Sequence, residues 1–517
     1  MLAAMTTTTP TLARTLWERA RRDPGGELVR RAGERPWTAR ELWGAASSLA
    51  NQLGTAVATG DVVVTATDTG PEALTASAAV SALGAVELPL APDTSFEWAL
   101  HLASTSGAGA LLTTPDRVTP LTERLASAAH LQIHVVEPEP SARASGVEVV
   151  PVSRHATDPA LIMTTSGTTG RTKAALLPVG APIGQARRVA QAMHYGPGDV
   201  LLSSFAWHHV NARHACFLPA LISGARVVVT PRFSASRFLD VARSEGVTAF
   251  NFMGAMCAML LAQPPSETDH MHQVRTAYGG PAPADLVDRF RDRFGITLRQ
   301  AYACTELGDV SVTPVDALRP GAAGRVVDDY EVRVVDDGMR PVPAGEIGEI
   351  LVRPRREGLA FLGYVGDTDA TRAAWYDGWF RTRDRGHLEG DWLHVDGRLG
   401  DVIRRRGLNI DPQHVEQAVS VHPGVAQVAA IAVPSELTED EVLAVVVPVA
   451  GSGLNAETLW NDCRDRLPRH LVPRFISVES TLPLNGSLKI DRGSLRSRGL
   501  PETAWDADAQ LTTHQEI

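Results

Sequence analysis

Residues 164–173 read Thr-Thr-Ser-Gly-Thr-Thr-Gly-Arg-Thr-Lys and follow an apolar segment, residues 160–163, that is typical of a short buried strand. Hydroxyl groups and glycine N–H groups can surround anionic oxygens closely, and Lys173 adds a positive charge. This chemistry suits a polyphosphate. The spacing is not that of a Walker A loop, because no Gly-Lys-[Ser/Thr] follows the required spacer. Taken alone, the stretch fits a Ser/Thr/Gly-rich surface loop equally well.

Length and composition restrict the class of protein. A chain of 517 residues exceeds the size of one core, so two or more domains are expected. Its 44% hydrophobic and 21% charged residues are typical of a soluble globular protein. A formal charge of −10 argues against a general nucleic-acid binder and offers no basic face to an anionic membrane. The four cysteines have neither metal-like nor disulfide-like spacing, which predicts a reduced, cytoplasmic setting.

The two ends of the sequence are polar. The first ten residues are small and Thr-rich without a long apolar segment, so we expect no secretory signal, and Met5 is an alternative start. No segment reaches the apolar length of a membrane span. Residues 501–517 are polar and aperiodic, and we expect a disordered tail there.

The pattern along the chain predicts an α/β fold. Helical patterns alternate with short strands over residues 11–150 and 200–303, which favours α/β layers. Residues 324–397 alternate with period two, which favours an antiparallel, β-barrel-like subdomain. The predicted organisation is a large N-terminal domain at residues 1–397, a hinge at 398–401 and a small, mobile C-terminal α+β domain at 402–500. The individual predicted strands are residues 61–66, 84–90, 200–203, 226–230, 249–252, 331–335, 348–352, 427–433 and 441–449, and the predicted helices are residues 212–222 and 236–245.

Four further segments combine glycine, hydroxyl, carboxylate and basic side chains at strand ends or turns. They are Tyr278-Gly-Gly-Pro-Ala282, Gln300-Ala-Tyr-Ala-Cys-Thr-Glu306, the pair Gly378-Trp-Phe-Arg-Thr-Arg-Asp384 and Asp396-Gly-Arg398, and Leu482-Pro-Leu-Asn-Gly-Ser-Leu-Lys-Ile-Asp-Arg492.

The order and spacing of all these motifs resemble the adenylate-forming superfamily, which includes acyl-CoA synthetases, peptide-synthetase adenylation domains and luciferases. The resemblance covers about residues 16–495. Around residues 209–211, 231–236 and 252–256 the sequence is most similar to the carnitine/crotonobetaine-CoA ligase branch. It implies that ATP and a carboxylate form an acyl adenylate and pyrophosphate. The small lobe then rotates, and an acceptor, usually the CoA thiol, displaces AMP.

The resemblance also implies residue roles. Lys489 is expected to bridge the attacking anion and the α-phosphate, Thr305 to hold that phosphate, and Glu306 to position Mg²⁺, a hard cation that prefers oxygen ligands. Because the attacking group is already anionic, the reaction needs no general base. The ATP-binding residues are expected to be Thr165, Ser166, Gly167, Thr168, Thr169, Gly170 and Lys173 around the β- and γ-phosphates, Gly279, Gly280, Pro281 and Tyr302 around adenine, and Asp384 and Arg398 around the ribose.

An acid-binding pocket is expected beside these groups, and His209 is expected to line it with a role in catalysis. Its mixture of aromatic and small side chains suits a planar or medium-sized acid. A zinc site at His208, His209 and His214 is disfavoured, because three side chains at 100° per residue do not converge and no HExxH spacing exists. The pocket residues are expected to be Trp207, His209, Phe252, Met253, Met256 and Tyr278.

Each of these residues also has a purely structural interpretation. Thr305 and Glu306 fit the start of a helix, where a hydroxyl caps and an acid is favourable. Asp384 and Arg398 fit a surface ion pair contributing about 0–1 kcal/mol. Lys489 fits a solvated turn lysine, and Tyr302 fits a core tyrosine at a strand end.

The sequence departs from the family pattern at five places. The phosphate loop reads Gly170-Arg-Thr-Lys-Ala174 where relatives have Gly-x-Pro-Lys-Gly, and the usual Thr-Gly-Asp is Thr382-Arg-Asp384. Gly400 replaces the Asp or Lys of the hinge. Further along, the branch's Gly-Glu-Asn-Ile is Gly407-Leu-Asn-Ile410, and the closing Ser-Gly-Lys is Ser487-Leu-Lys489. The last three changes affect the second half-reaction, so the acceptor stays open.

The leading hypothesis is an ATP- and Mg²⁺-dependent enzyme that adenylates a small carboxylic acid and passes it to CoA. The alternative is adenylation of nitrite with transfer to an aryl amine, as in an ATP-dependent diazotase, or amide formation, in secondary metabolism. A non-catalytic nucleotide-binding relative is a third hypothesis. A P-loop kinase is disfavoured by the missing Walker signature. We expect small-molecule partners rather than nucleic acid or membrane, and either a monomer or a homodimer.

Overall fold

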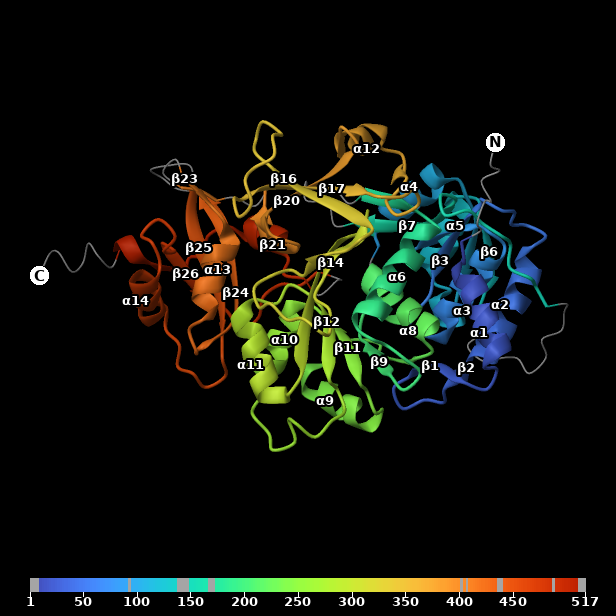
Figure 1. Cartoon of the computed structure of the whole chain (residues 1–517), viewed down its shortest axis with the longest axis horizontal. Helices are drawn as coiled ribbons and strands as arrows, with labels where there is room; N and C mark the ends of the chain where they lie inside the picture. Colours follow the sequence, from blue (N-terminus) through green and yellow to red (C-terminus); the bar gives the residue numbers. More distant parts are fainter. Residues whose placement is uncertain are drawn as a thin grey trace, which may run out of the picture.

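The computed structural model describes residues 9–91, 94–136, 148–165, 173–399, 403–405, 408–434, 440–485 and 489–509. It confirms an α/β fold with a large N-terminal domain and a small C-terminal domain (Figure 1). Among the described residues, no helix combines the length and apolarity needed to cross a membrane.

The larger of the two main sheets has fourteen strands, and six of them form a parallel part. Its parallel strands carry almost continuous apolar runs such as Val227 and Val228, which are 2% and 1% exposed, because helices cover both faces. A short edge strand, β2 (Trp37–Thr38), pairs antiparallel with β1. The parallel strands, in sheet order, are β13 (Thr297–Cys304), β12 (Thr276–Gly279), β11 (Ala249–Phe252), β9 (Val200–Ser203), β10 (Arg226–Val229) and β1 (Glu27–Arg31).

The antiparallel half of the same sheet begins where β13 turns back into β14 (Gly308–Val312). The β-rich region expected as a barrel-like subdomain therefore pairs in one unbroken path with the parallel strands. Its alternating pattern places one face on a core around Tyr330 and Ile350. Its remaining strands, in sheet order, are β15 (Arg325–Val326), β21 (Trp392–Arg398), β20 (Trp379–Glu389), β17 (Gly348–Pro354) and β16 (Tyr330–Val335), with β19 (Trp375–Tyr376) beside β20.

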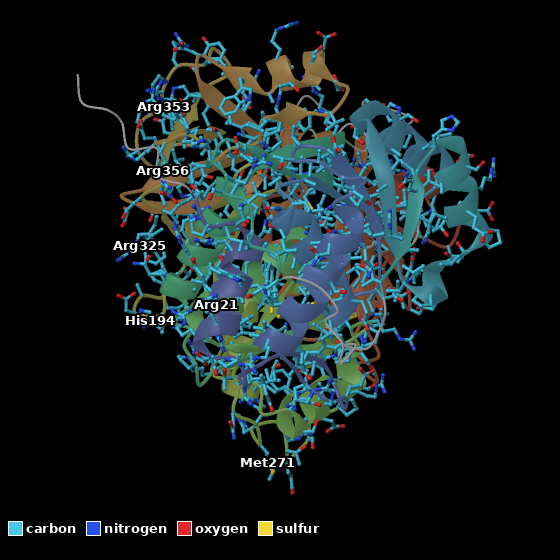
Figure 2. All side chains as sticks on the ribbon, turned by 90° about the vertical axis from the view of Figure 1, so that its right-hand side faces the viewer. Arg21, His194, Met271, Arg325, Arg353 and Arg356 are labelled. Atoms are coloured by element: carbon cyan, nitrogen blue, oxygen red, sulfur yellow. The ribbon has the colours of Figure 1, made fainter. Side chains whose placement is uncertain are left out.

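Arginines of this antiparallel half project from the surface, as Figure 2 shows for Arg325, Arg353 and Arg356. Each of the three forms an ion pair with a nearby carboxylate. Because a carboxylate neutralises each of them, these three arginines do not form a positively charged surface patch.

The second sheet has seven strands and contains the hydroxyl-rich stretch. Strands β7 (Pro159–Thr165) and β8 (Lys173–Pro178) form an antiparallel pair in which Thr165 is the register partner of Lys173. Helix α6 (Gly180–Ala192) follows and contacts both β8 and β14, so it lies between the two sheets (Figure 1). The other strands, in order outward from β8 and β7, are β18 (Gly363–Tyr364) on one side, and β4 (Val86–Pro89), β3 (Val62–Ala66), β5 (Ala108–Thr113) and β6 (Gln132–Val135) on the other.

The helices cover the two sheets and begin at caps that the sequence supplies. Thr38 and Glu41 form a capping box at the start of α2, which satisfies backbone donors there. The helix predicted at residues 212–222 is interrupted by a π-helical turn at Arg213–Phe217. This turn joins α7 (Val210–Ala212) to α8 (Leu218–Ser223). The other helices of the N-terminal domain are α1 (Leu12–Arg22), α2 (Ala39–Leu53), α3 (Pro71–Ala82), α4 (Phe96–Ser106), α5 (Pro120–Ala128), α9 (Ala235–Ser244), α10 (Gly254–Leu261), α11 (Ala284–Phe294) and α12 (Thr368–Ala373).

The C-terminal lobe packs its own apolar core around a four-stranded sheet. It contacts the large domain through α13 against β21 and through β24 against α10, where the Gln427 side chain donates to the carbonyl of Ala255 at 3.5 Å. Its elements are β22 (Ile403–Arg405), β23 (Leu408–Ile410), α13 (Pro412–Ser420), β24 (Val425–Pro434), β25 (Asp440–Pro448), α14 (Ala456–Arg466), β26 (Phe475–Val478), α15 (Arg492–Arg498) and β27 (Trp505–Asp506).

The expectation of a disordered tail from residue 501 is wrong for residues 501–509. Trp505 and Asp506 form β27, which pairs with β26, and the carboxylate of Asp506 accepts two hydrogen bonds from Arg474 at 3.0 Å. The Trp505 ring also packs 5.5 Å from the Trp460 ring. Two aromatic rings and an ion pair give this short segment enough contact to overcome its chain entropy. Residues 510–517 lie outside the described part of the chain.

Candidate functional site

The β7–β8 pair holds the two ends of the hydroxyl-rich stretch at one place. Thr165 and Lys173 face each other in the register, and Ser166, Gly167, Thr168, Thr169 and Gly170 lie outside the described residues. The Lys173 ammonium nitrogen lies 4.8 Å from the centre of the Tyr364 ring on the neighbouring strand β18. A cation over an aromatic face is held in place without losing its charge.

Tyr364 links Lys173 to Glu306. Its hydroxyl donates to Oε1 of Glu306 at 2.7 Å, across 58 residues of sequence. Thr305 and Glu306 lie in the turn between β13 and β14, so they do not begin a helix, and that structural interpretation is wrong. Glu306 is 9% exposed. Among the described residues, Tyr364 is the one side chain that hydrogen-bonds this carboxylate, which leaves acceptor positions for a metal or water.

A second carboxylate, Asp384, lies in the middle of β20 (Trp379–Glu389). It is 6% exposed, accepts the Tyr302 hydroxyl on Oδ2 at 2.6 Å and accepts the Nε–H of Arg398 on Oδ1 at 2.8 Å. Asp384 and Arg398 are register partners on β20 and β21, so the sheet fixes their separation. The pair is therefore buried on its acidic side rather than lying on the open surface. Each carboxylate oxygen has further lone pairs and can accept a hydroxyl from a ligand.

Lys489 enters this group from the C-terminal lobe. Its backbone N–H donates to Oδ1 of Asn485 at 3.0 Å, and its carbonyl accepts the Asn485 N–H at 2.8 Å, which fixes the turn. The side chain keeps solvent contact yet is crowded by the opposite domain. That desolvation, together with the nearby positive charge of Arg398, lowers the pKa of Lys489, and the negative charge of Asp384 opposes the change. The lobe therefore brings an ammonium group to the Asp384–Arg398 pair.

The glycines after β12 serve close packing of the backbone. A Cβ at Gly279 would lie 2.0 Å from the carbonyl oxygen of Phe252, its register partner on β11. A Cβ at Gly280 would meet the carbonyl oxygen of Ala301 at 3.2 Å. Only glycine allows these two strand ends to approach so closely, next to the strand that carries Tyr302. Pro281 follows directly.

A buried polar network lies beneath β13 and β14. Asp309 is 1% exposed and accepts from Nε2 of Gln185 at 2.9 Å, and Oε1 of Gln185 lies 3.2 Å from Nδ1 of His214. Burial raises the pKa of Asp309 to about 6, while the charge of Arg188 and the hydroxyl of Tyr278 oppose that rise. Burial lowers the pKa of His214 to about 3, so this imidazole is neutral.

The histidine segment has two buried rings, His208 and His214, and one half-buried ring, His209. His208 is 9% exposed, and burial lowers its pKa to about 3, whereas His209 is half-buried and packs 4.2 Å from the His208 ring. His214 is bonded to Gln185 instead. Within the described residues, these three histidines do not form a metal-ligating group.

The six predicted pocket residues do not share one environment. Trp207 is 5% exposed, its indole N–H donates to Oγ of Ser77 at 2.9 Å, and the Arg213 guanidinium covers its ring. Trp207 therefore belongs to the core, and this placement does not favour contact with a substrate. Phe252 and Met256 are fully buried in the same core, and Tyr278 is 3% exposed.

Two half-buried side chains, Asn211 and Met253, lie next to each other near these predicted pocket residues. Met253 follows β11, and the Asn211 side chain lies with its amide nitrogen 4.0 Å from the Met253 sulfur. The side-chain Oδ1 of Asn211 accepts from the Nδ2–H of Asn251 at 2.7 Å. Asn211, two residues after His209 along the chain, thus places an amide beside the thioether of Met253.

A separate cavity of about 60 Å³ lies inside the N-terminal domain. Its lining includes Ser77, Glu87, Arg154 and Arg213, and it excludes Tyr302, Asp384 and Lys489. The buried Arg213–Glu87 ion pair forms part of the cavity lining. This cavity is therefore distinct from the candidate site.

Among the residues that depart from the family pattern, Arg383 lies within the described part of the structure. It adopts φ +62°, a left-handed conformation that glycine favours and a side chain disfavours by about 1–2 kcal/mol. The backbone of Thr382-Arg-Asp384 thus keeps the shape that a glycine would adopt more easily. Gly400, Gly407, Ser487 and Leu488 lie outside the described residues, as does the side chain of Leu408.

The composition adds a feature that sequence reasoning missed. Of the 49 Lys and Arg residues, only Lys173 and Lys489 are lysine. One flanks the hydroxyl-rich stretch, and the other reaches the Asp384–Arg398 pair. A lysine is a compact, mobile point charge, which suits a phosphate that moves, whereas arginine suits fixed bidentate contacts. Tyr364 was also missed, because its link to Glu306 is purely tertiary.

Comparison with known proteins agrees with this geometry. The family model described as AMP-binding enzyme matches residues 16–365, and the AMP-binding enzyme C-terminal domain matches residues 414–489. A feruloyl-CoA synthase of Amycolatopsis sp is 32% identical over 93% of this chain and 97% of its own. A crotonobetaine/carnitine–CoA ligase of Salmonella typhi is 29% identical over 66% of each chain, so the predicted likeness to that branch is present among the relatives.

Among solved structures, the O-succinylbenzoate coenzyme A synthetase of Bacillus subtilis in complex with ATP and magnesium ion superposes with a TM-score of 0.79. It is 26% identical and covers 95% of this chain and 100% of its own. The predicted family is confirmed. This chain belongs to the AMP-binding enzyme family, the adenylate-forming superfamily, and is an AMP-forming ligase of the acyl-CoA synthetase type.

Proposed function

We propose that the enzyme uses ATP and Mg²⁺ to adenylate a small carboxylic acid and then transfers the acyl group to CoA. The observation that carries the proposal is the approach of Lys489, from the C-terminal lobe, to the Asp384–Arg398 pair and its neighbour Tyr302. The relatives named CoA synthase or CoA ligase support CoA as the acceptor.

The nucleotide would lie across the ends of β12 and β13 and the middle of β20. Asp384 would accept the ribose hydroxyls with the lone pairs that Tyr302 and Arg398 leave unused. The Tyr302 ring and the close backbone at Gly279 and Gly280 would hold the adenine, with Pro281 beside them. Arg398, 44% exposed on its side chain, would extend along the ribose or the phosphates.

The phosphate end would lie toward Lys173. Lys173 would neutralise the β- and γ-phosphates beside the hydroxyl-rich stretch, with Thr165 at the edge of that stretch. Glu306 fits a magnesium ligand, because its nearly buried carboxylate has acceptor positions that Tyr364 does not use. When bound there, Mg²⁺ would supply charge neutralisation for the leaving pyrophosphate. Thr305, half-buried in the same turn, would donate to the α-phosphate.

The chemical task of these side chains is to offset repulsion between two anions. A carboxylate attacking a phosphate needs no proton removed, so the site needs positive charge and in-line placement. Lys489 supplies that charge at the junction of the two reactants in the observed lobe position. The desolvation that lowers its pKa also strengthens its interaction with an anion.

The acid would bind beyond the α-phosphate, near His209, Asn211 and Met253. One imidazole, one amide and one thioether there give a surface that is partly polar and of limited length. Such a surface suits a small or medium-sized planar acid better than a long fatty chain.

A single assay tests the proposal and its alternatives. Purified enzyme with ATP and Mg²⁺ would be given a panel of aromatic and short aliphatic acids, with and without CoA, and AMP, pyrophosphate and thioester would be measured. A parallel arm would contain nitrite and an aryl amine, and another an acid and an amine. Acid-dependent AMP and thioester formation is the expected result. If AMP forms with nitrite but with none of the acids, the enzyme is a diazotase rather than an acid–CoA ligase. ATP cleavage to ADP in every arm would refute adenylation.

A further inference from the structure

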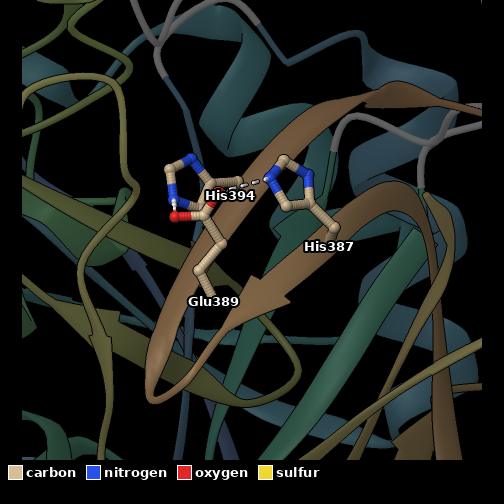
Figure 3. A group of neighbouring side chains, drawn as sticks. All are labelled: His387, Glu389 and His394. Atoms are coloured by element: carbon tan, nitrogen blue, oxygen red, sulfur yellow. Dashed lines mark ion pairs between the residues drawn. The ribbon is translucent and has the colours of Figure 1, made fainter. Parts of the chain in front are cut away.

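A cluster of two histidines and a glutamate lies beside the turn between β20 and β21 (Figure 3). His387 and His394 are register partners across the hairpin, and Glu389 is the last residue of β20. Alternate residues of a strand share one face, so His387 and Glu389 point the same way, and cross-strand partners also share a face. The two-residue turn at 390–391 therefore brings all three side chains together.

The ligand atoms of these three side chains are close enough to converge on one ion. One ligand atom from each lies within 4.8 Å of the other two. Nε2 of His387 is 3.8 Å from Oε1 of Glu389, and Nε2 of His394 is 3.8 Å from Oε2 of the same carboxylate. Zinc bonds of about 2.0–2.1 Å in a tetrahedron place ligand atoms about 3.3–3.4 Å apart. Closing the site would shorten the two 3.8 Å distances by about half an ångström and would turn the stacked rings so that both Nε2 atoms point at one ion.

The surrounding contacts orient the ligands as in known metal sites. Nδ1 of His387 lies 2.8 Å from Oδ2 of Asp396, an arrangement that places the proton on Nδ1 and leaves Nε2 as the ligand atom. Arg319 forms an ion pair with Oε2 of Glu389, which leaves Oε1 for a metal. Nε2 of His394 is buried and has no hydrogen bond within the described residues. A buried polar atom without a partner costs about 1–3 kcal/mol.

Packing alone accounts for only part of this arrangement. The two imidazole rings stack with centroids 4.6 Å apart and planes 10° apart, and this would stabilise the hairpin without a metal. Packing does not explain why the Nε2 edges of both rings face the same carboxylate, or why an aspartate fixes the far nitrogen of one ring. Within the described residues, this is the one group of three or more potential ligand side chains.

We propose that His387, His394 and Glu389 bind one divalent transition-metal ion, with zinc as the best match, and that water completes the coordination. Two imidazoles and one carboxylate are ligands that zinc commonly takes. The side chains of His387 and His394 are 18% and 17% exposed and that of Glu389 is 44% exposed, so solvent can reach a fourth position. The ion would tie together the two strands that carry Asp384 and Arg398 further along the same ladder.

The test uses the full-length protein without a histidine tag, stripped with a chelator. Zinc would be titrated against a chromophoric chelator in the absence of nucleotide, and bound metal would be counted by elemental analysis after desalting. The expected result is one equivalent of zinc per chain and a higher melting temperature with zinc than without. Cobalt should give the visible absorption of a four-coordinate site.

Variants assign the site to these residues. His394→Gln and His387→Gln should abolish stoichiometric binding, and Asp396→Asn, which keeps all three ligands, should weaken it about 10–100-fold. The matched control is His155→Gln, at a lone exposed histidine, which should bind like the wild type. Glu306→Gln should also bind zinc normally, which separates this site from the nucleotide site.

Two results would overturn the proposal. One is less than a tenth of an equivalent of zinc at micromolar free metal in the wild type. The other is wild-type zinc affinity both in Asp396→Asn and in one of the two single histidine variants. Circular dichroism of the metal-free variants shows whether the hairpin changes have unfolded the chain. If the histidine variants do not fold, the Asp396→Asn affinity decides alone.

Discussion

Replacing Lys489 with alanine tests the adenylation geometry directly. The change removes an ammonium group that the C-terminal lobe brings to Asp384 and Arg398. Because the backbone N–H and carbonyl of residue 489 make the hydrogen bonds to Asn485, those bonds survive in the variant. A solvent-accessible side chain of this kind changes the free energy of unfolding by about 0.5 kcal/mol or less. The fold should therefore remain intact.

The effect on rate should be large. Two unit charges about 4 Å apart interact by about 4 kcal/mol at the effective dielectric of a protein surface. Removing one preorganised donor from a transition state typically costs about 2.7–4 kcal/mol, or about 10²–10³-fold in rate. Arg398 stays in place and still supplies positive potential nearby. We therefore expect Lys489→Ala to slow AMP formation by about two orders of magnitude, the lower end of that range.

The measurement is acid-dependent AMP release at saturating ATP, with the melting temperature measured in parallel. The matched variant is Lys489→Arg, which keeps the charge but places it on a larger, planar group, and it should retain intermediate activity. Wild-type AMP formation in Lys489→Ala would remove this lysine from the first half-reaction. Equal losses in both variants together with a large fall in melting temperature would show that the residue acts through folding instead.

Four other outcomes follow from the described contacts. Asp384→Asn should weaken ATP binding about 10–100-fold in calorimetric titration, because hydrogen bonds to a charged group are worth about 1.5–3 kcal/mol, and unchanged affinity would exclude the ribose role. Arg383→Gly should raise the free energy of unfolding in urea by about 0.5–1 kcal/mol by relieving the left-handed backbone, and a loss of stability would show that the arginine side chain makes a compensating contact. The raised pKa of Asp309, about 6, means that the folded state holds its proton more tightly than the unfolded state, so stability falls as pH rises from about 4 to about 6. Asp309→Asn should remove that fall and be more stable at pH 7 by at most about 3 kcal/mol, and an unchanged pH profile would contradict the assignment. Finally, ATP with Mg²⁺ should protect both Lys173 and Lys489 from an amine-reactive reagent in peptide mass spectrometry, and equal labelling with and without nucleotide would contradict their placement at the phosphates.

Several parts of the fold could be predicted because they depend on local pattern. The apolar runs predicted as strands at residues 61–66, 200–203 and 226–230 are β3, β9 and β10, each within one residue, since apolar pattern and β-branched side chains act over a few positions. The pairing of Asp384 with Arg398 was also accessible, because both flank one hairpin. Local pattern could not place the Trp207 side chain, which was predicted to line the pocket. Its indole N–H donates to Ser77 in the core, a partner 130 residues away.

Sequence by itself determined the family, the order of the strands and helices along the chain, and which segments carry hydroxyls, carboxylates and the two lysines. It did so because those properties belong to single residues and short periods. The tertiary structure decided which of these groups meet. Tyr364 hydrogen-bonds Glu306, the charges of Asp384 and Arg398 act on Lys489 across two domains, and His387 faces His394 only once the hairpin register is set. Such contacts depend on packing between distant segments, which no local pattern specifies.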